Sequence, residues 1–264
     1  LHLMVETALV PASDIKAILD RIRMTNNMED AVAGADHIIE SVPENLKAKQ
    51  EIFARLDEIC PPYVTLATNS SGLRADDCAA MVKNHPERIL ITHYWHPAPF
   101  IPLVEVIGGK RTDPAVLDRI VGLLRTMRKK VVLQKLELPL PPAGWANALQ
   151  WPFEELARRM VTEKGCEPQM VDDIIRFGFG RRLPFTGMFI RYDNIGLDFF
   201  TNAAKARDAE PWGPFKERVE RGETGMKSGK GFYDWPGDSA NQYLRNFNLE
   251  LIHLLKKDME RGDV

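Results

Sequence analysis

The chain has 264 residues, and 35 basic against 37 acidic side chains give it a net charge of −2. With 27% charged and 44% hydrophobic residues, its composition argues against long disorder and fibrous repeats. The balanced charge argues against a dedicated nucleic-acid binder, because such proteins usually carry a basic excess. No run approaches the ~18 uninterrupted apolar residues that a membrane-spanning helix needs, so no membrane partner is expected.

The cysteines are few and widely spaced. Cys60, Cys78 and Cys166 are odd in number, which fits a reducing, cytoplasmic compartment better than a disulfide framework. Their spacing is not that of metal ligands, so no metal site is expected. The opening residues lack the basic and apolar regions of a signal peptide.

Helical and strand patterns alternate through the first half of the chain. Capping residues followed by apolar residues at helical spacing predict the helices, and short apolar runs predict the strands. The expected helices are residues 13–34, 45–59, 74–83 and 112–128, and the expected strands are 36–42, 63–68, 89–92, 103–107 and 131–133. This alternation predicts an α/β domain with a largely parallel sheet.

The pattern changes at residues 137–144, where three prolines cannot continue a helix or a central strand. We place a domain boundary there, between residues 1–138 and 139–264. Beyond it the pattern is mainly helical, with helices expected at 147–164, 167–177, 193–207 and 240–260. The predicted fold class is therefore α/β followed by all-α.

A histidine and a glutamate form the first candidate site. His93 lies at the carboxyl end of a predicted strand, where open α/β sheets place their ligands. Histidine titrates near neutral pH, so it can take the proton of an alcohol as hydride leaves the carbon. Glu105 follows twelve residues later on the next predicted strand, and a carboxylate there could fix the imidazole tautomer. A lone histidine is more often structural, so further motifs are needed.

The segment from His93, HYWHPAPFIPLVEV, resembles the signature of the 3-hydroxyacyl-CoA dehydrogenase family, roughly His-Phe-x-Asn-Pro-x-x-x-x-x-Leu-Val-Glu-Val. The spacing between His93 and Glu105 equals that of the family. The resemblance implies that His93 is the catalytic base and Glu105 its orienting partner.

Two earlier segments match the same family in the same order. The segment ENLKAK resembles Glu-Asn-x-x-x-Lys, which implies that Glu44 and Lys49 lie near the nicotinamide cofactor. The segment TNSSGL resembles Ser-Asn-Thr-Ser-Ser-Leu, which implies that Asn69 binds cofactor and that Ser71 contacts both substrate and cofactor. By themselves, both segments would be interpreted as helix caps.

Two later segments extend the resemblance, and one residue, His96, differs from the family pattern. Asn147, in GWAN, resembles the Asn of Pro-Gly-Phe-x-x-Asn-Arg, which approaches the catalytic His and the substrate carbonyl. Lys227, in GMKSGKGFY, matches Gly-x-Lys-x-Gly-x-Gly-Phe-Tyr, whose Lys reaches toward the cofactor. His96 stands where the family usually has an Asn near the nicotinamide, and imidazole can still donate or accept a hydrogen bond.

The resemblance implies an NAD-dependent oxidoreductase that oxidises the L-3-hydroxyl of an acyl-CoA to a 3-ketone, a reaction of fatty-acid β-oxidation. A Rossmann-like domain would bind NAD. The helical domain would close over the substrate and form a homodimer.

The sequence also departs from the family. The family begins with a strand and a Gly-x-Gly-x-x-Gly turn that seats the cofactor pyrophosphate on a helix N-terminus. No such motif occurs in these residues, so the first βαβ portion of the domain is expected to be absent. Ala148 replaces the Arg after the Asn, and Arg128 replaces a Gly at a helix end that often requires a left-handed residue.

Two alternatives stay open. The first is a CoA-free 3-hydroxy-acid dehydrogenase of the same superfamily, such as a gulonate or carnitine dehydrogenase. The second is a non-catalytic structural relative, which the missing glycine-rich turn favours. The acyl-chain length, the choice between NAD and NADP and the reaction direction also stay open.

Overall fold

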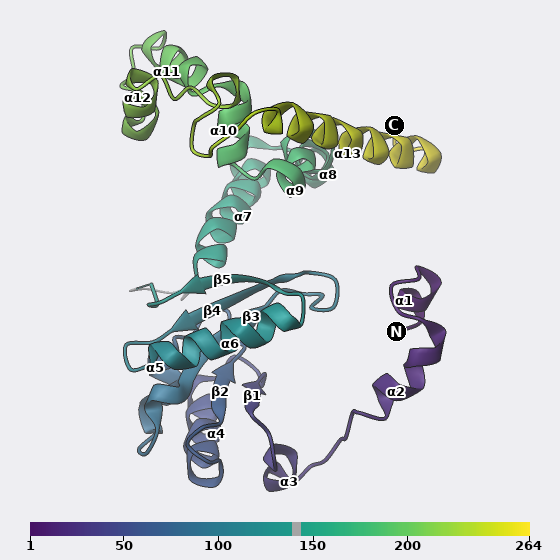
Figure 1. The fold of residues 1–264 in the computed structure, drawn as a ribbon, viewed down its shortest axis with the longest axis vertical. Helices are drawn as coiled ribbons and strands as arrows, with labels where there is room; N and C mark the ends of the chain where they lie inside the picture. Colours follow the sequence, from purple (N-terminus) through teal and green to yellow (C-terminus); the bar gives the residue numbers. More distant parts are fainter. Residues whose placement is uncertain (139–143) are drawn as a thin grey trace. The chain divides into compact units, whose positions relative to one another are not determined.

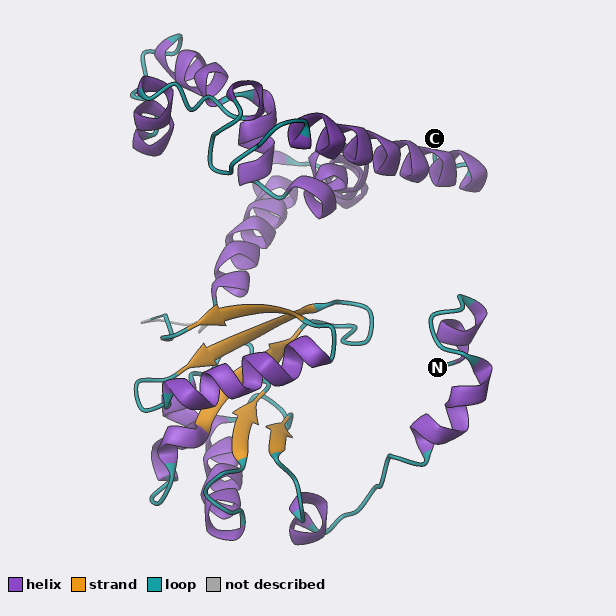
Figure 2. Ribbon diagram, viewed as in Figure 1, coloured by secondary structure: helices purple, strands orange, loops and turns teal. Residues whose placement is uncertain are grey.

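The computed structural model describes residues 1–138 and 144–264, in which a sheet with flanking helices is followed by a helical region (Figures 1 and 2). It has two compact units, Leu1–Glu154 and Glu155–Val264, which divide within helix α7, Trp145–Lys164. The boundary predicted after residue 138 lies earlier, and most of the proline-rich stretch that suggested it lies outside the described residues. The first turn of α7 belongs with the sheet because the Trp145 N–H donates to Gln134 Oε1 at 3.1 Å.

A five-stranded sheet in the order β1-β2-β3-β4-β5 forms the centre of the first unit. Its strands are β1 His37–Glu40, β2 Thr65–Thr68, β3 Ile89–Tyr94, β4 Leu103–Gly108 and β5 Lys130–Gln134. Neighbouring strands run parallel except β3 and β4, which are antiparallel. The predicted α/β class with a largely parallel sheet is confirmed.

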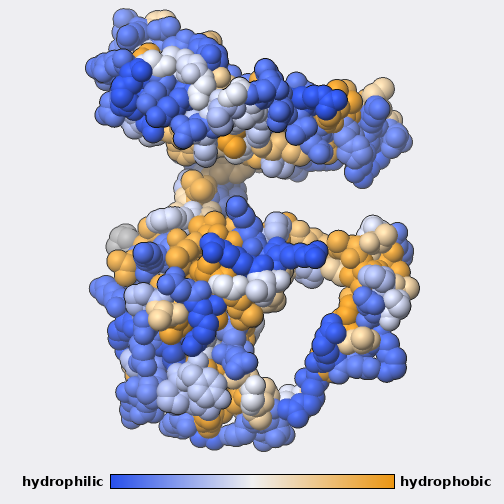
Figure 3. All heavy atoms as spheres, viewed as in Figure 1, coloured by the Kyte–Doolittle hydropathy of each residue, from blue (hydrophilic) through white to orange (hydrophobic). Residues whose placement is uncertain are grey.

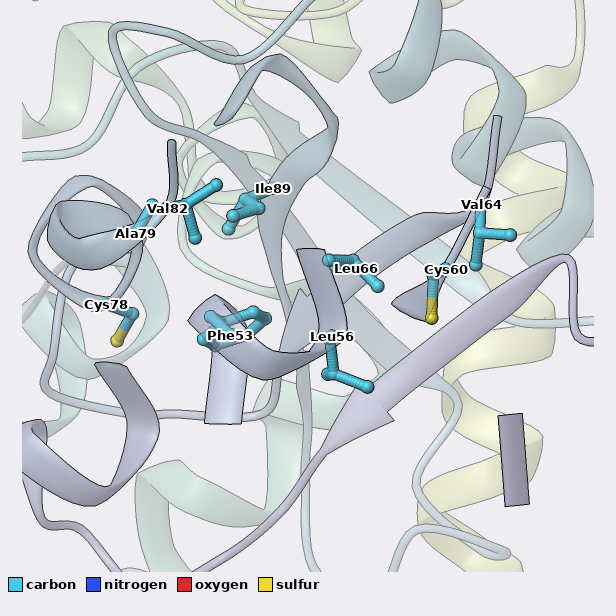
Figure 4. Close-up of a cluster of buried hydrophobic side chains, with 9 residues drawn as sticks. All are labelled: Phe53, Leu56, Cys60, Val64, Leu66, Cys78, Ala79, Val82 and Ile89. Atoms are coloured by element: carbon cyan, nitrogen blue, oxygen red, sulfur yellow. The ribbon is translucent and has the colours of Figure 1, made fainter. Parts of the chain in front are cut away.

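Helices cover both faces of this sheet. Those after β1 are α4 Leu46–Ile59, α5 Ala75–Cys78 with a 3-10 turn at Ala79–Met81, and α6 Pro114–Thr126. Phe53 of α4 packs with Leu66 and Ile89 on one face (Figure 4). The next residues along those strands, Ala67 and Leu90, pack against α6 on the other face. Because successive side chains of a strand point to opposite faces, each strand contributes to both clusters.

The segment before the sheet differs from its prediction. The predicted continuous helix at 13–34 is instead the short helix α2, Ile15–Leu19, an extended stretch, and α3, Met28–Val32. Asn27 causes the new start, because its Oδ1 accepts the Asp30 N–H at 2.8 Å and so caps α3. Helix α1, His2–Glu6, lies further upstream.

Arg128 adopts the left-handed conformation that its place after α6 suggested, with φ +57°. A side chain in that region costs about 1 kcal/mol that glycine avoids. We therefore expect Arg128→Gly to raise the free energy of unfolding by up to about 1 kcal/mol in urea denaturation. Glycine at Thr126, the last residue of α6, should lower it instead. A lower midpoint for Arg128→Gly would contradict this account.

The second unit is helical, as predicted. After α7 come α8 Pro168–Asp173, a π-helical turn Ile174–Gly178, a 3-10 turn Phe179–Arg182, α9 Leu183–Thr186, α10 Phe189–Ile195, α11 Leu197–Lys205, α12 Gly213–Glu220, a 3-10 turn Met226–Ser228 and α13 Ser239–Arg261. One helix predicted at 193–207 is in fact two, because Gly196 adopts φ +106° and ends α10. In the described part of the chain, no helix is long and apolar enough to cross a bilayer.

Candidate active site

The carboxyl ends of β1, β2 and β3 meet at one edge of the sheet, because these three strands run parallel. Asn69, directly after β2, ties the three ends together. Its N–H donates to the Glu40 carbonyl at 2.8 Å, and its Oδ1 accepts the Tyr94 N–H at 2.9 Å. Open α/β sheets bind ligands at this kind of edge.

His93 and Glu105 form a cross-strand pair at this edge. The antiparallel register of β3 and β4 places them directly opposite each other, with His93 Nδ1 at 2.9 Å from Glu105 Oε2. The His93 side chain is 12% exposed and that of Glu105 only 2%. An ionised carboxylate only accepts hydrogen bonds, so Nδ1 carries the proton in this pair and Nε2 is the nitrogen that can accept another.

Glu105 is held from its other side by the start of α7. The Ala146 N–H donates to Glu105 Oε1 at 2.9 Å. Burial alone would raise the pKa of Glu105, but the hydrogen bonds from His93 and the Ala146 N–H lower it below its ordinary value. Glu105 therefore stays ionised at neutral pH and can stabilise a protonated His93.

Gly144 is needed for this close approach. A Cβ on Gly144 would lie 2.8 Å from Glu105 Oε1 and 3.0 Å from Ile107 Cδ1. We expect Gly144→Ala to displace Glu105 and lower kcat by about tenfold to a hundredfold, since displacements near 1 Å can cost that much. Gly122→Ala is the matched control, because a Cβ on Gly122 in α6 meets nothing within 4 Å. Equal activity in the two variants would rule out this role for Gly144.

The two other predicted catalytic residues are in contact with each other. Asn147, buried in α7, donates from Nδ2 to the Ser71 carbonyl at 2.9 Å. Ser71 itself is exposed. Ala146, whose N–H donates to Glu105, directly precedes Asn147 in the chain. The four predicted catalytic residues are therefore connected through the hydrogen bonds of His93 with Glu105, of Glu105 with Ala146, and of Asn147 with Ser71.

Of the two predicted cofactor residues at the start of α4, Glu44 is at the surface and Lys49 is buried. The Ser70 hydroxyl and the Gly72 N–H, the latter at 3.2 Å, donate to Glu44 Oε1. Burial raises the pKa of Glu44, but these bonds and the Lys49 charge more than offset it, so its pKa is below the ordinary value. The Lys49 side chain lies beneath the surface, and its ammonium contacts Glu40 Oε1 at 2.8 Å and Glu44 Oε2 at 3.5 Å.

Sequence reasoning missed Ser70 and Glu40. Ser71 matched the family pattern, yet Ser70 is the serine whose side chain binds Glu44. Glu40 could have been noticed as an acidic residue that ends an apolar strand, a place where a buried partner for Lys49 is required.

His96 lies in the connection between β3 and β4 and is exposed. The ring of its neighbour Trp95 lies near the His93–Glu105 pair, with the ring centroids of His93 and Trp95 5.7 Å apart. His96 is therefore carried on the same connection that follows His93.

Lys227 belongs to the second unit, where its ammonium contacts Asp198 Oδ2 at 2.6 Å. Its glycine-rich loop wraps around Asp193, a fully buried carboxylate that sequence reasoning also missed. The N–H groups of Phe232 and Tyr233 donate to Asp193 at 2.8 and 3.0 Å. A Cβ on Gly231 would collide with that carboxylate, which explains a glycine of the motif structurally.

Comparisons with known proteins agree on one family. Residues 1–136 match the family model "3-hydroxyacyl-CoA dehydrogenase, NAD binding domain", and residues 145–235 match "3-hydroxyacyl-CoA dehydrogenase, C-terminal domain". A probable 3-hydroxybutyryl-CoA dehydrogenase of Bacillus subtilis is 32% identical over 230 residues, covering 84% of this chain and 77% of that protein. An L-carnitine dehydrogenase of Mesorhizobium japonicum is 32% identical over 182 residues, and the match covers 67% of this chain and 48% of that protein.

The fold of a solved structure agrees as well. The 3-hydroxyacyl-CoA dehydrogenase of Archaeoglobus fulgidus superposes with a TM-score of 0.77 at 26% identity, covering 96% of this chain and 86% of that one. This likeness extends across both compact units.

Proposed function

The chain belongs to the 3-hydroxyacyl-CoA dehydrogenase family of NAD-dependent oxidoreductases, and we propose that it interconverts an L-3-hydroxyacyl-CoA and the 3-ketoacyl-CoA. The single observation that carries the proposal is the His93–Glu105 pair at the carboxyl ends of the strands. The name of the Bacillus relative supports the substrate class.

His93 is the base of the proposed reaction. Its Nε2 takes the proton of the 3-hydroxyl, while Nδ1–H donates to Glu105 and the carboxylate stabilises the imidazolium. When bound, NAD supplies the hydride acceptor. In the reverse direction His93 returns the proton to the ketone oxygen.

Ser71 and Asn147 are proposed to hold the reacting oxygen. Ser71 is an exposed residue, and its hydroxyl can donate a hydrogen bond as charge builds on that oxygen. Asn147 fixes the backbone of Ser71 through its carboxamide, so it supports the serine as well.

The residues at this edge fit the nicotinamide end of NAD. Glu44 presents a half-exposed carboxylate that can accept hydrogen bonds from cofactor hydroxyl or amide groups. We assign Glu44, Asn69 and His96 to the cofactor, with Lys49 acting through Glu44. Lys227, in the second unit, is assigned to the cofactor on its sequence motif alone. No Gly-x-Gly-x-x-Gly turn occurs in the sequence, so no residue is assigned to the pyrophosphate.

A second candidate, CoA-free oxidation of a 3-hydroxy acid, is favoured by the L-carnitine dehydrogenase of Mesorhizobium japonicum, which has the same 32% identity as the Bacillus relative, although over 182 residues rather than 230. Both reactions use the same base and the same hydride acceptor. They differ in whether the acid group is a thioester, so substrate competition separates them.

We also propose that the protein forms a homodimer through its helical unit and works in the cytoplasm. Helix α13 exposes an apolar stripe of Leu249, Ile252, Leu255 and Met259. Figure 3 shows hydrophobic, orange atoms on the surface in the region of α13. A stripe with this spacing is typical of a helix face that packs on another surface. The cytoplasmic location is supported by the three cysteines, all of which are free thiols.

The test is the oxidation of NADH by the 264-residue protein, followed by its absorbance, with acetoacetyl-CoA or free acetoacetate as substrate. Turnover with acetoacetyl-CoA that is lost in His93→Ala supports the proposal. Turnover with the free acid alone supports the CoA-free reaction. No turnover with either substrate, in folded protein, supports the non-catalytic relative.

A further inference from the structure

Glu40, the last residue of β1, is a buried carboxylate with every approach occupied. Its side chain is 1% exposed. Lys49 Nζ donates to its two oxygens at 2.8 and 3.0 Å, the Thr68 hydroxyl donates to Oε2 at 2.7 Å, and the Val42 N–H donates to Oε1 at 2.6 Å. Such a charged group is tolerated in the interior only because it is paired and hydrogen-bonded.

Lys49 lies between this buried carboxylate and the exposed one of Glu44. Its ammonium also donates to the Val42 carbonyl at 3.1 Å and lies 3.5 Å from Glu44 Oε2. The side chain of Lys49 is 1% exposed, whereas that of Glu44 is 44% exposed. Cys78, whose thiol interacts electrostatically with Lys49, Glu40 and Glu44, stays neutral because burial raises the pKa of that thiol to about 12.

The three charges therefore sum to a single negative charge, and the exposed member carries it. Glu40 neutralises Lys49 in the interior, where Coulomb interactions are strong. Without the negative charge of Glu40, Lys49 would have Glu44 as its one ionic partner in this cluster, and the negative charge at the strand ends would be cancelled.

We propose that Glu40 is a positioning residue for the cofactor: by neutralising Lys49, it leaves Glu44 a net negative charge to present to the nicotinamide ring. This proposal rests on the proposed function for its cofactor part and on the contacts above for its electrostatic part. The oxidised ring carries one more positive charge than the reduced ring, so a carboxylate beside it favours binding of NAD⁺ over NADH.

The electrostatic part is tested in the cofactor-free protein by NMR. The Gly72 and Leu73 N–H groups donate to Glu44, so their pH titration reports its pKa. We expect Glu40→Gln to lower the pKa of Glu44, because Lys49 is then no longer neutralised. Lys49→Met should raise it, because Glu40 then repels Glu44. An unchanged titration in Glu40→Gln would overturn the proposal.

Asp57→Asn is the matched control for this change. Asp57 is likewise a buried carboxylate, it pairs with the buried Arg88 at 3.1 Å, and it lies on α4. It makes no contact with Glu44, so Asp57→Asn should leave the Glu44 titration and the cofactor preference unchanged. An effect as large as that of Glu40→Gln would mean that loss of a buried pair is itself the cause.

The cofactor part is tested by calorimetric titration with NAD⁺ and with NADH. We expect Glu40→Gln to weaken NAD⁺ binding at least about fivefold more than NADH binding, on the scale of one charge interaction. The double variant Glu40→Gln/Lys49→Met removes both buried charges and should restore the preference for NAD⁺. If the single variant does not fold, the double variant still tests whether removing both charges leaves the cofactor preference unchanged.

If Glu40→Gln weakened the binding of NAD⁺ and NADH equally, or if the double variant did not restore the preference for NAD⁺, the proposed role of Glu40 toward NAD would be refuted. If the unaltered protein binds neither cofactor, the proposed function fails at this site, whereas the Glu44 titration still decides the electrostatic relation.

Discussion

Replacing His93 by glutamine is expected to lower kcat by about 100- to 10,000-fold, the usual contribution of a positioned general base. Glutamine preserves the polar contact with Glu105 but cannot take a proton from the substrate hydroxyl. Binding of NADH should change little, because the proton transfer occurs in the chemical step. The measurement is steady-state NADH oxidation with acetoacetyl-CoA, with circular dichroism to verify the fold.

His85→Gln is the control for this prediction. His85 pairs with Glu87 through Nδ1 at 3.0 Å, so the chain contains a second His–Glu pair, away from the carboxyl ends of the parallel strands. We expect full activity from His85→Gln. If His93→Gln retained more than about a tenth of the activity, general-base catalysis by His93 would be excluded.

Arg88→Met is expected to lower the free energy of unfolding by about 3–5 kcal/mol, because it leaves the buried Asp57 without its ionic partner. The Arg88 guanidinium donates to Asp57 Oδ1 at 3.1 Å and to the carbonyls of Cys60 and Pro61, which connects the end of α4 with the approach to β2. The expected loss is a large part of the ~5–15 kcal/mol that stabilises a typical domain. Urea denaturation measures it.

The same pair makes stability depend on acid. Burial raises the pKa of Asp57, but N–H groups of Asn84 and His85 and the charge of Arg88 lower it below its ordinary value. A depressed pKa in the folded state gives stability that is present above the ordinary value of about 3.9 and is lost as pH falls through the folded value.

In Arg88→Met, the free energy of unfolding should therefore fall less steeply as pH decreases below that value. Arg55→Met removes an arginine that is half exposed and paired with Glu29 and Glu58, and it should change neither quantity appreciably. A similar loss in both arginine variants would contradict the special role of the buried pair.

The strands of the sheet and the helices between them were predictable because local patterns determine them. The apolar run before Thr68 and the proline that opens α6 mark elements whose limits differ from prediction by only a few residues. The long helix predicted before the sheet was wrong, because the capping of α3 by Asn27 outweighs a loose helical periodicity.

The site was predictable as a set of residues from motif order, but their contacts were not. The spacing of His93 and Glu105 suggested a pair. Only the antiparallel register of β3 and β4 places the two side chains opposite each other. Ser70, rather than Ser71, binds Glu44, and a linear motif contains no information on which serine points inward.

The sequence by itself determined the element order, the family motifs and the residue types at the site. The tertiary structure decided which of these residues are buried and which charges meet. Lys49 looks like a surface cofactor ligand in the sequence, but its ammonium donates to the buried carboxylate of Glu40, which also accepts the Thr68 hydroxyl. Glu40 and Thr68 lie on two different strands, 9 and 19 residues from Lys49 along the chain. Burial and ion pairing depend on segments that meet only when the sheet forms, so local patterns cannot specify them.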